Sequence, residues 1–156
     1  MRRVNNQTPR EKDRQKGSVV VEFAIVLPIL VIILLGIMEV GSIARDYQVL
    51  QNSAREGARF SAIPANQIGT AQNPTAVLQT IQNRVVAYLQ NENITVAPAD
   101  VVVDQAYPVQ IGPLTVMGSH VTVQYNRPAI FPGASSLIPS LGSLQLSGNA
   151  VFRNFY

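Results

Sequence analysis

The sequence predicts an α+β protein that is held at a membrane by one long N-terminal helix. Three observations support this prediction. An uncharged apolar run near the N-terminus is long enough to cross a bilayer, an amphipathic helical pattern follows further on, and the last third of the chain alternates Val, Thr and Tyr with polar residues. We expect one long helix, a second helix and a small antiparallel β-sheet of about four strands.

The formal net charge of the 156 residues is +3, and this charge is concentrated at the N-terminus. Residues 1–16 hold six basic and two acidic side chains, a balance of +4, so the remaining residues sum to −1. A basic tail before an apolar run is typical of the cytoplasmic flank of a membrane segment, and we favour this interpretation over nucleic-acid binding. The chain has no cysteine, which excludes disulfides and thiolate metal sites.

Residues 23–38 form the apolar run and contain no charged side chain. With residues 19–22 the segment reaches twenty residues, which as a helix would span roughly 30 Å. We therefore expect the membrane part of the helix at about 19–40, with Pro28 producing a kink or a local opening. The basic tail places the N-terminus in the cytoplasm and the C-terminus outside.

Cleavage by a signal peptidase is the main alternative for this segment. Ser42-Ile43-Ala44 has the small-x-small pattern of such a site, and cleavage after Ala44 would release a soluble binding domain. The length of the apolar run and the glutamates at its two ends, Glu22 and Glu39, favour retention of the helix instead.

The helical pattern continues as an amphipathic stalk over residues 41–62, and Pro64 ends it. Small side chains repeat along this stalk at Ala54, Ala58 and Ala62, with Ser53, Gly57 and Ser61 beside them. Such a stripe either admits the backbone of a neighbouring chain or fits the helix to its own sheet. Both interpretations are open at this point.

Residues 63–156 are expected to form a small α+β domain. Asn73 is the predicted N-cap and Pro74 the first-turn residue of a second helix, which extends to about Asn91. Its apolar face is predicted to hold Val77, Leu78, Ile81, Val85 and Leu89. Strands are predicted at residues 93–97, 100–107, 114–126 and 144–156, with a proline-rich crossover loop at 128–143 before the last of them.

The sequence contains no constellation that would support catalysis or metal binding. The single histidine, His120, has no HxxH or HExxH partner, and Asp100 and Asp104 alone do not make a calcium loop. A glycine-rich phosphate loop and a GxSxG motif are also absent. We therefore expect no enzymatic activity, no metal site and no cofactor.

The stretch KGSVVVEF, residues 16–23, places Glu22 at the entrance of the apolar run, directly after Gly17, Ser18 and three valines. This order resembles the leader and first helix of the type IV pilin superfamily, in which a prepilin peptidase cuts after the glycine and glutamate is the fifth mature residue. The resemblance implies cleavage between Gly17 and Ser18, a cytoplasmic leader over residues 1–17, and a long helix over residues 18–62.

Residues 17–62 are more closely similar to the N-terminal signature of the TadE-like proteins, the minor pilins or pseudopilins of the tight-adherence (Flp, type IVc) pilus. The matching pieces are Val21-Glu22-Phe23, Val26-Leu27-Pro28, Gly36-Ile37-Met38-Glu39 and the run from Asn52 to Arg59. The resemblance implies a pilin-like fold and a structural role in pilus assembly and cell adhesion. It also implies an inner or cytoplasmic membrane location, with the C-terminal domain periplasmic or extracellular.

The partners implied by the resemblance are the major pilin, other TadE-like or TadF-like minor pilins, the prepilin peptidase, the assembly platform and the bilayer. Cleavage would free an α-amine at Ser18, which is cationic below about pH 8 and can pair with a carboxylate. The resemblance therefore implies that Glu22, with Phe23, sets the register of the docked subunit.

A second set of site residues comes from the stalk, where the resemblance implies packing against the globular domain or a partner helix. These residues are Ala54, Arg55, Glu56, Gly57, Ala58 and Arg59. A solvated stalk face is the alternative. If the leader is not cleaved, the chain would instead be a permanent single-pass anchor with an outward binding domain, and Gly17 would be dispensable.

Overall fold

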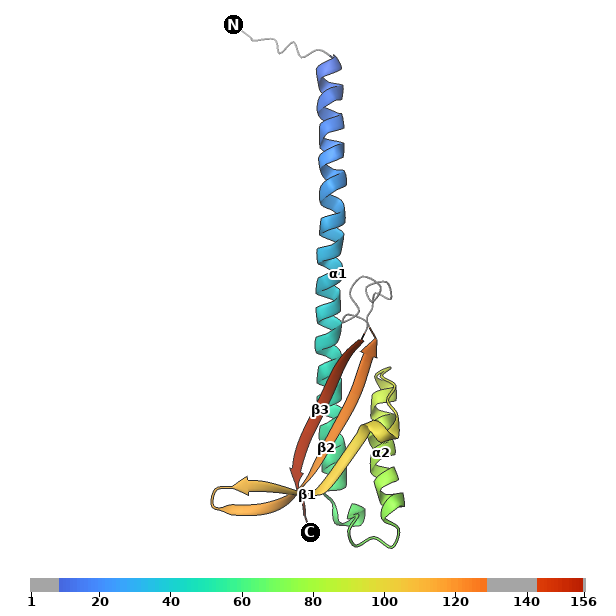
Figure 1. Cartoon of the computed structure of the whole chain (residues 1–156), viewed down its shortest axis with the longest axis vertical. Helices are drawn as coiled ribbons and strands as arrows, with labels where there is room; N and C mark the ends of the chain where they lie inside the picture. Colours follow the sequence, from blue (N-terminus) through green and yellow to red (C-terminus); the bar gives the residue numbers. More distant parts are fainter. Residues whose placement is uncertain (1–8, 129–142, 156) are drawn as a thin grey trace. The chain divides into compact units, whose positions relative to one another are not determined.

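The computed structural model of the chain describes residues 9–128 and 143–155, with side chains from residue 19 onward. Within these residues, two long helices and three strands follow one another in the order α1, α2, β1, β2 and β3, with two short 3₁₀ turns before β1. Figure 1 shows these elements along the chain. The predicted α+β class is confirmed, and the chain divides into two units, Met1–Ser42 and Ile43–Tyr156.

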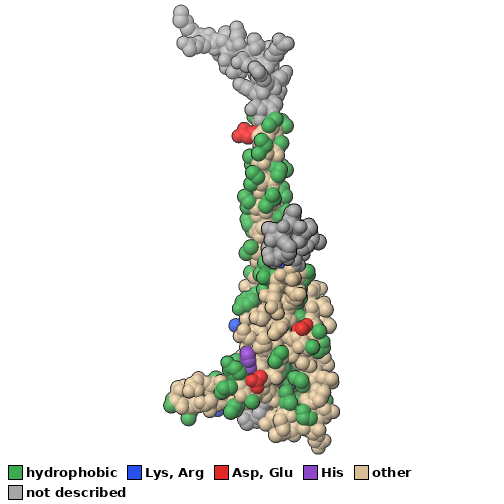
Figure 2. Space-filling view, in the orientation of Figure 1, with side chains coloured by type: hydrophobic (Ala, Val, Ile, Leu, Met, Phe, Trp, Pro, Cys, Tyr) green, Lys and Arg blue, Asp and Glu red, His purple; other side chains and the backbone are tan. Residues whose placement is uncertain are grey.

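The N-terminal unit is helical. Helix α1 extends over Pro9–Ser61 and contains Pro28. All side chains of residues 19–34 are exposed, and Figure 2 shows mainly hydrophobic side chains on the visible face of this part of α1. Within the described residues α1 is the one helix that is long and apolar enough to cross a membrane. Because none of its most apolar segment is buried in the chain, this segment is not the core helix of a soluble domain.

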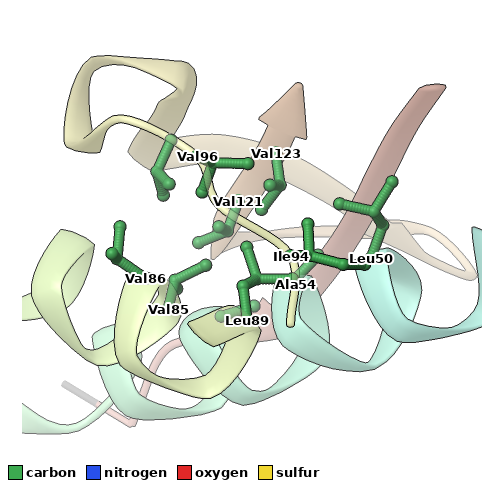
Figure 3. Close-up of a cluster of buried hydrophobic side chains, with 11 residues drawn as sticks. Leu50, Ala54, Val85, Val86, Leu89, Ile94, Val96, Val121 and Val123 are labelled. Atoms are coloured by element: carbon green, nitrogen blue, oxygen red, sulfur yellow. The ribbon is translucent and has the colours of Figure 1, made fainter. Parts of the chain in front are cut away.

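In the C-terminal unit, the last turns of α1 share one hydrophobic core with α2 and the strands (Figure 3). From α1, this core receives Leu50, Ala54 and Ala58. From the rest of the unit, it receives Val85, Val86, Leu89, Ile94, Val96, Val101, Val121 and Val123. Because a fully buried Leu or Val contributes about 1.5–3 kcal/mol, this cluster fixes the C-terminal part of α1 to its own domain.

Helix α2 spans Pro74–Asn91, and the predicted start is confirmed. The Asn73 side chain accepts a hydrogen bond from Ala76 N at 3.1 Å, and Pro74 occupies the first turn, where its missing N–H costs nothing. The buried residues of α2 are Ile81, Val85, Val86 and Leu89. The prediction omitted Val86, while Val77 and Leu78 are only half-buried.

The strand predicted at residues 93–97 is wrong, because the end of α2 uses this segment. Asn93 adopts a left-handed φ of 62°, and Ile94 N donates to Leu89 O at 2.9 Å, which is the pattern of a Schellman cap. Ile94 and Leu89 are both buried in the core, so the segment is held by side-chain packing without strand pairing. The short turn Pro98–Asp100 then leads directly into the sheet.

Within the described residues the sheet has three strands instead of about four, in the order β1-β2-β3 and all antiparallel. They are β1 (Val101–Ile111), β2 (Leu114–Pro128) and β3 (Ser143–Arg153). Gly112, with a φ of 61°, and Pro113, with its ring-fixed φ of about −65°, connect β1 to β2 as in a type II′ turn. The loop predicted at 128–143 lies almost entirely outside the described residues.

Candidate functional site

The predicted processing site and the predicted assembly residues lie at the start of the apolar segment. The backbone of Gly17 and Ser18 is helical, since α1 begins at Pro9. Glu22 and Phe23 follow within the same helix, and both side chains are exposed in this chain. An ionisable carboxylate at the start of an apolar helix is costly in hydrocarbon unless it finds a partner.

The stripe of small side chains on α1 is filled by the chain itself. Ser53, Ala54, Ala58, Ser61 and Ala62 are fully buried, and Gly57 is buried as well. A Cβ atom at Gly57 would lie 2.5 Å from Val85 Cγ2 and 3.3 Å from Val121 Cγ1. In this structure the stripe therefore fits α1 to its own helix α2 and its own sheet, the second of the two interpretations that the sequence left open.

Glu56 joins α1 to α2 through two arginines. Its Oε2 accepts from Arg59 Nη2 at 3.0 Å on the same helix, and its Oε1 accepts from Arg84 Nη2 at 3.0 Å on α2. The hydrogen bond from Arg84 lowers the pKa of Glu56 most strongly; burial raises it, and the hydrogen bond and charge of Arg59 lower it further. Arg84 also lies over the Phe60 ring, 5.7 Å from its centroid.

Arg55 and Arg59 are exposed on α1 and line a surface groove of about 500 Å³. The groove is also lined by Asn52 and Glu56 from α1, Tyr88 from α2, and Val151 and Phe152 from β3. The structure thus separates the six predicted stalk residues by role. Ala54, Gly57 and Ala58 are buried in the domain, whereas Arg55, Glu56 and Arg59 face this groove.

Sequence reasoning missed Arg84, and it also missed a second ion pair. Arg127 Nε, near the end of β2, donates to Asp46 Oδ2 at 2.7 Å, with the two side chains 6% and 15% exposed. The sequence feature that could have indicated both pairs is the scarcity of charged residues around these arginines. Arg84 is the single charged residue of residues 74–91, and Arg127 is the first charged residue after Asp104. Because burying an unpaired charge is costly, a single charged side chain in a largely apolar element is expected to pair with a group on another element.

A polar clamp at the end of α1 was missed as well. The Gln105 side chain donates from Nε2 to Ser61 O at 3.0 Å and to Asn66 O at 2.7 Å, and its Oε1 accepts from Ile68 N at 2.7 Å. Asn154 Nδ2 donates to Gln105 O at 2.9 Å. These bonds fix the chain where it leaves α1, next to the C-terminal end of the sheet.

The residues considered for chemistry make ordinary structural contacts. The His120 ring packs on Tyr107, with centroids 4.6 Å apart, and its Nε2 lies 3.4 Å from Thr122 Oγ1. Asp100 and Asp104 accept hydrogen bonds from the nearby backbone N–H groups of Ala97 and Ala106. Among the described residues, no three His, Cys, Asp or Glu side chains are grouped so that they could hold a metal ion.

The comparisons with known proteins address the N-terminal part of the chain. A model of the family described as TadE-like protein matches residues 17–59, which confirms the resemblance over that segment. The searches of curated proteins and of solved structures gave no match. The matched segment begins at the predicted cleavage glycine and ends at Arg59, the last arginine of the groove. Over residues 17–59, the chain is therefore similar to the TadE-like protein family.

Proposed function

We propose that this chain is a minor pilin, or pseudopilin, that takes part in assembling a tight-adherence (type IVc) pilus. The observation that carries the proposal is the TadE-like match over residues 17–59, which begins at Gly17 and includes the whole exposed apolar segment. That family is a structural component of a pilus system, so no catalytic role is proposed. Adhesion would be a property of the complete pilus.

The proposed maturation step is cleavage by a prepilin peptidase between Gly17 and Ser18. Glycine suits such a site because it presents no side chain to the peptidase and allows an extended backbone. Cleavage removes residues 1–17 with their basic side chains and leaves Glu22 as the fifth residue of the product. Before cleavage, the same basic residues would keep the N-terminus in the cytoplasm.

Glu22 would then act in assembly through its charge. The new α-amine at Ser18 is cationic at neutral pH, and the carboxylate of Glu22 lies one helical turn away along the chain. In a bundle of apolar helices, pairing this carboxylate with the amine of a neighbouring subunit removes the cost of two isolated charges. The pairing would define how far one subunit is displaced along the next, with Phe23 packed beside it.

The C-terminal unit would face the periplasm or the exterior and contact other subunits. The partners proposed are the major pilin, other TadE-like or TadF-like minor pilins, and the assembly platform in the membrane. In support of this, the unit has a hydrophobic core of its own and carries exposed charged and aromatic side chains outside that core.

The proposal is tested by deleting the prepilin peptidase and determining the mass of the full chain from membranes. We expect a chain starting at Ser18 when the peptidase is present and an uncleaved leader when it is absent. The Gly17→Leu variant should remain uncleaved in both strains, whereas Gly41→Leu, a matched change at an exposed glycine of the same helix, should be cleaved normally. Cleavage of Gly17→Leu at the same bond would contradict the proposal.

A further inference from the structure

The groove on the C-terminal unit combines positive charge with aromatic and apolar surface. It is formed by three elements of one unit, α1, α2 and β3, and has a volume of about 500 Å³. The α1 residues that line it are Asn52, Arg55, Glu56 and Arg59, and the other lining residues are Tyr88, Val151 and Phe152. Arginine and aromatic side chains are the residue types most enriched where proteins bind one another tightly.

The charge of the groove is not balanced. Glu56 already accepts hydrogen bonds from both Arg59 and Arg84, so its single negative charge is shared between two guanidinium groups. Arg55 donates to the neutral Asn52 Oδ1 at 3.3 Å. Among the described residues that line the groove or pair with Glu56, there are therefore three arginines, Arg55, Arg59 and Arg84, and one glutamate. This excess of positive charge attracts carboxylates.

The arginines are available to an incoming group. The side chains of Arg59 and Arg84 are 65% and 56% exposed, and Arg55 is exposed as well. Arg55 and Arg59 are one helical turn apart on α1, so both guanidinium groups can reach the same bound segment. Each can form charge-assisted, paired hydrogen bonds with a carboxylate.

Apolar side chains at the other side of the groove are held in place but remain uncovered. Val151 is 42% exposed and Phe152 is 37% exposed. Phe152 packs on Phe155, with ring centroids 5.9 Å apart, and Phe155 N donates to Ala62 O at 3.1 Å. Two phenyl rings packed on each other at the surface offer apolar binding area.

We propose that this groove binds an acidic segment of a protein partner, with carboxylates on Arg55 and Arg59 and an apolar side chain on Phe152. The charge excess favours an anionic partner, and the exposed Phe152 ring favours an acidic peptide over a bare anion. An anionic lipid surface is the alternative occupant, and the test below distinguishes it from an acidic peptide. The proposal rests on the proposed function only for the class of partner, a neighbouring subunit of the pilus system.

The test uses the full chain purified in a nonionic detergent and two fluorescently labelled peptides of equal length. One peptide alternates Glu with Leu and Phe, and the other has Gln in place of every Glu. We expect the acidic peptide to bind about tenfold more tightly than the Gln peptide at low salt, and the difference to shrink as salt increases.

Variants then locate the binding. The double variant Arg55→Gln/Arg59→Gln should weaken binding of the acidic peptide about tenfold or more. Arg55→Gln alone, which leaves the ion pairs of Glu56 with Arg59 and Arg84 in place, should weaken binding by a smaller factor. Arg45→Gln is the matched control, because Arg45 is an exposed arginine of the same helix that lies outside the groove and pairs with Glu92.

Equal binding of the two peptides, or equal loss in the double variant and in Arg45→Gln, would overturn the proposal. Displacement of the acidic peptide when phosphatidylglycerol is added to the micelles would also overturn it, in favour of a lipid surface. The peptide-binding measurement does not depend on cleavage between Gly17 and Ser18. A chain that is cleaved there but binds both peptides equally would refute peptide binding at the groove and leave the proposed function intact.

Discussion

Arg127 Nε lies 2.7 Å from Asp46 Oδ2, so that a largely buried ion pair joins the first turn of α1 within the C-terminal unit to the end of β2. The pair spans 81 residues of sequence, and its two side chains are 6% and 15% exposed. The neighbouring residue, Arg45, forms a second ion pair with Glu92. In this pair the Arg45 side chain is 61% exposed and the Glu92 side chain is 43% exposed. The two pairs therefore offer a direct comparison of a buried and an exposed contact.

Asp46→Asn is expected to lower the free energy of unfolding by about 3 kcal/mol, because it removes the Asp46 carboxylate from a largely buried ion pair with Arg127. Arg45→Gln, which breaks the exposed pair, should cost about 0–1 kcal/mol. Chemical denaturation of the full chain in detergent, followed by circular dichroism, measures both. Equal costs for the two variants would contradict a structural role for the buried pair.

Glu56 gives the stability of the C-terminal unit a defined pH dependence. Its pKa is lowered from the ordinary value of 4.5, chiefly by the hydrogen bond from Arg84. A lowered pKa in the folded state means that the ionised carboxylate stabilises the fold at pH values above 4.5, and that this contribution is lost as the pH falls through the folded-state pKa.

We therefore expect the melting temperature of the wild-type chain to exceed that of Glu56→Gln at neutral pH. The difference should narrow below pH 4.5 and vanish once the folded-state carboxyl group is protonated. Thermal melts of both chains from neutral pH to below pH 4.5 provide the measurement. Subtracting the two melting temperatures at each pH removes the effect of the other acidic groups. A difference that stays constant with pH would show that the charge of Glu56 is not the stabilising feature.

Gly57→Ala tests the close approach of α1 to α2. A methyl group at this position would collide with Val85, and such overpacking costs about 1–3 kcal/mol, which exceeds the gain of about 1 kcal/mol or less in helix propensity. Gly41→Ala on the same helix meets nothing within 4 Å and should keep the propensity gain. Denaturation of the two variants separates these outcomes. A Gly57→Ala chain as stable as Gly41→Ala would mean that the helices are not in contact there.

Glu22→Ala should leave cleavage before Ser18 intact but reduce incorporation into pili by about tenfold. This factor corresponds to a loss of about 1.4 kcal/mol when the Glu22 carboxylate no longer pairs with the α-amine of a neighbouring subunit. Glu22→Asp retains the charge and should recover most of the incorporation. Immunoblots of sheared pili and of membranes provide the ratio for each variant. Normal incorporation of a correctly cleaved Glu22→Ala chain would refute the role of this carboxylate in setting register.

The parts of the fold that follow from local sequence signals were predictable. The exposed apolar helix follows from an uncharged run of membrane length, and the start of α2 follows from Asn73 and Pro74. The strand predicted at residues 93–97 is wrong. Ile94 and Val96 alternate with polar residues as in a strand, but Ile94 N closes the cap of α2 and both side chains are buried in the core. Alternation alone does not reveal which backbone groups are already hydrogen-bonded.

The candidate site was predictable only in part, for a similar reason. The pairing of Glu56 with Arg59 follows from their spacing on one helix, whereas the contribution of Arg84 depends on how α2 lies against α1. The pair of Asp46 with Arg127 and the groove lined by Tyr88 and Phe152 likewise depend on contacts between elements far apart in sequence. Such contacts require the three-dimensional structure.

The central claim, that the chain is a processed pilus subunit, is tested most directly by the N-terminal residue of the mature protein. Mass spectrometry should be performed separately on the membrane fraction and on material sheared from the cell surface. We predict a chain beginning at Ser18 in both fractions. A mature chain beginning at Arg45 would instead identify a secreted domain released by signal peptidase, and an intact Met1 would identify a permanent membrane anchor; either result would contradict the account.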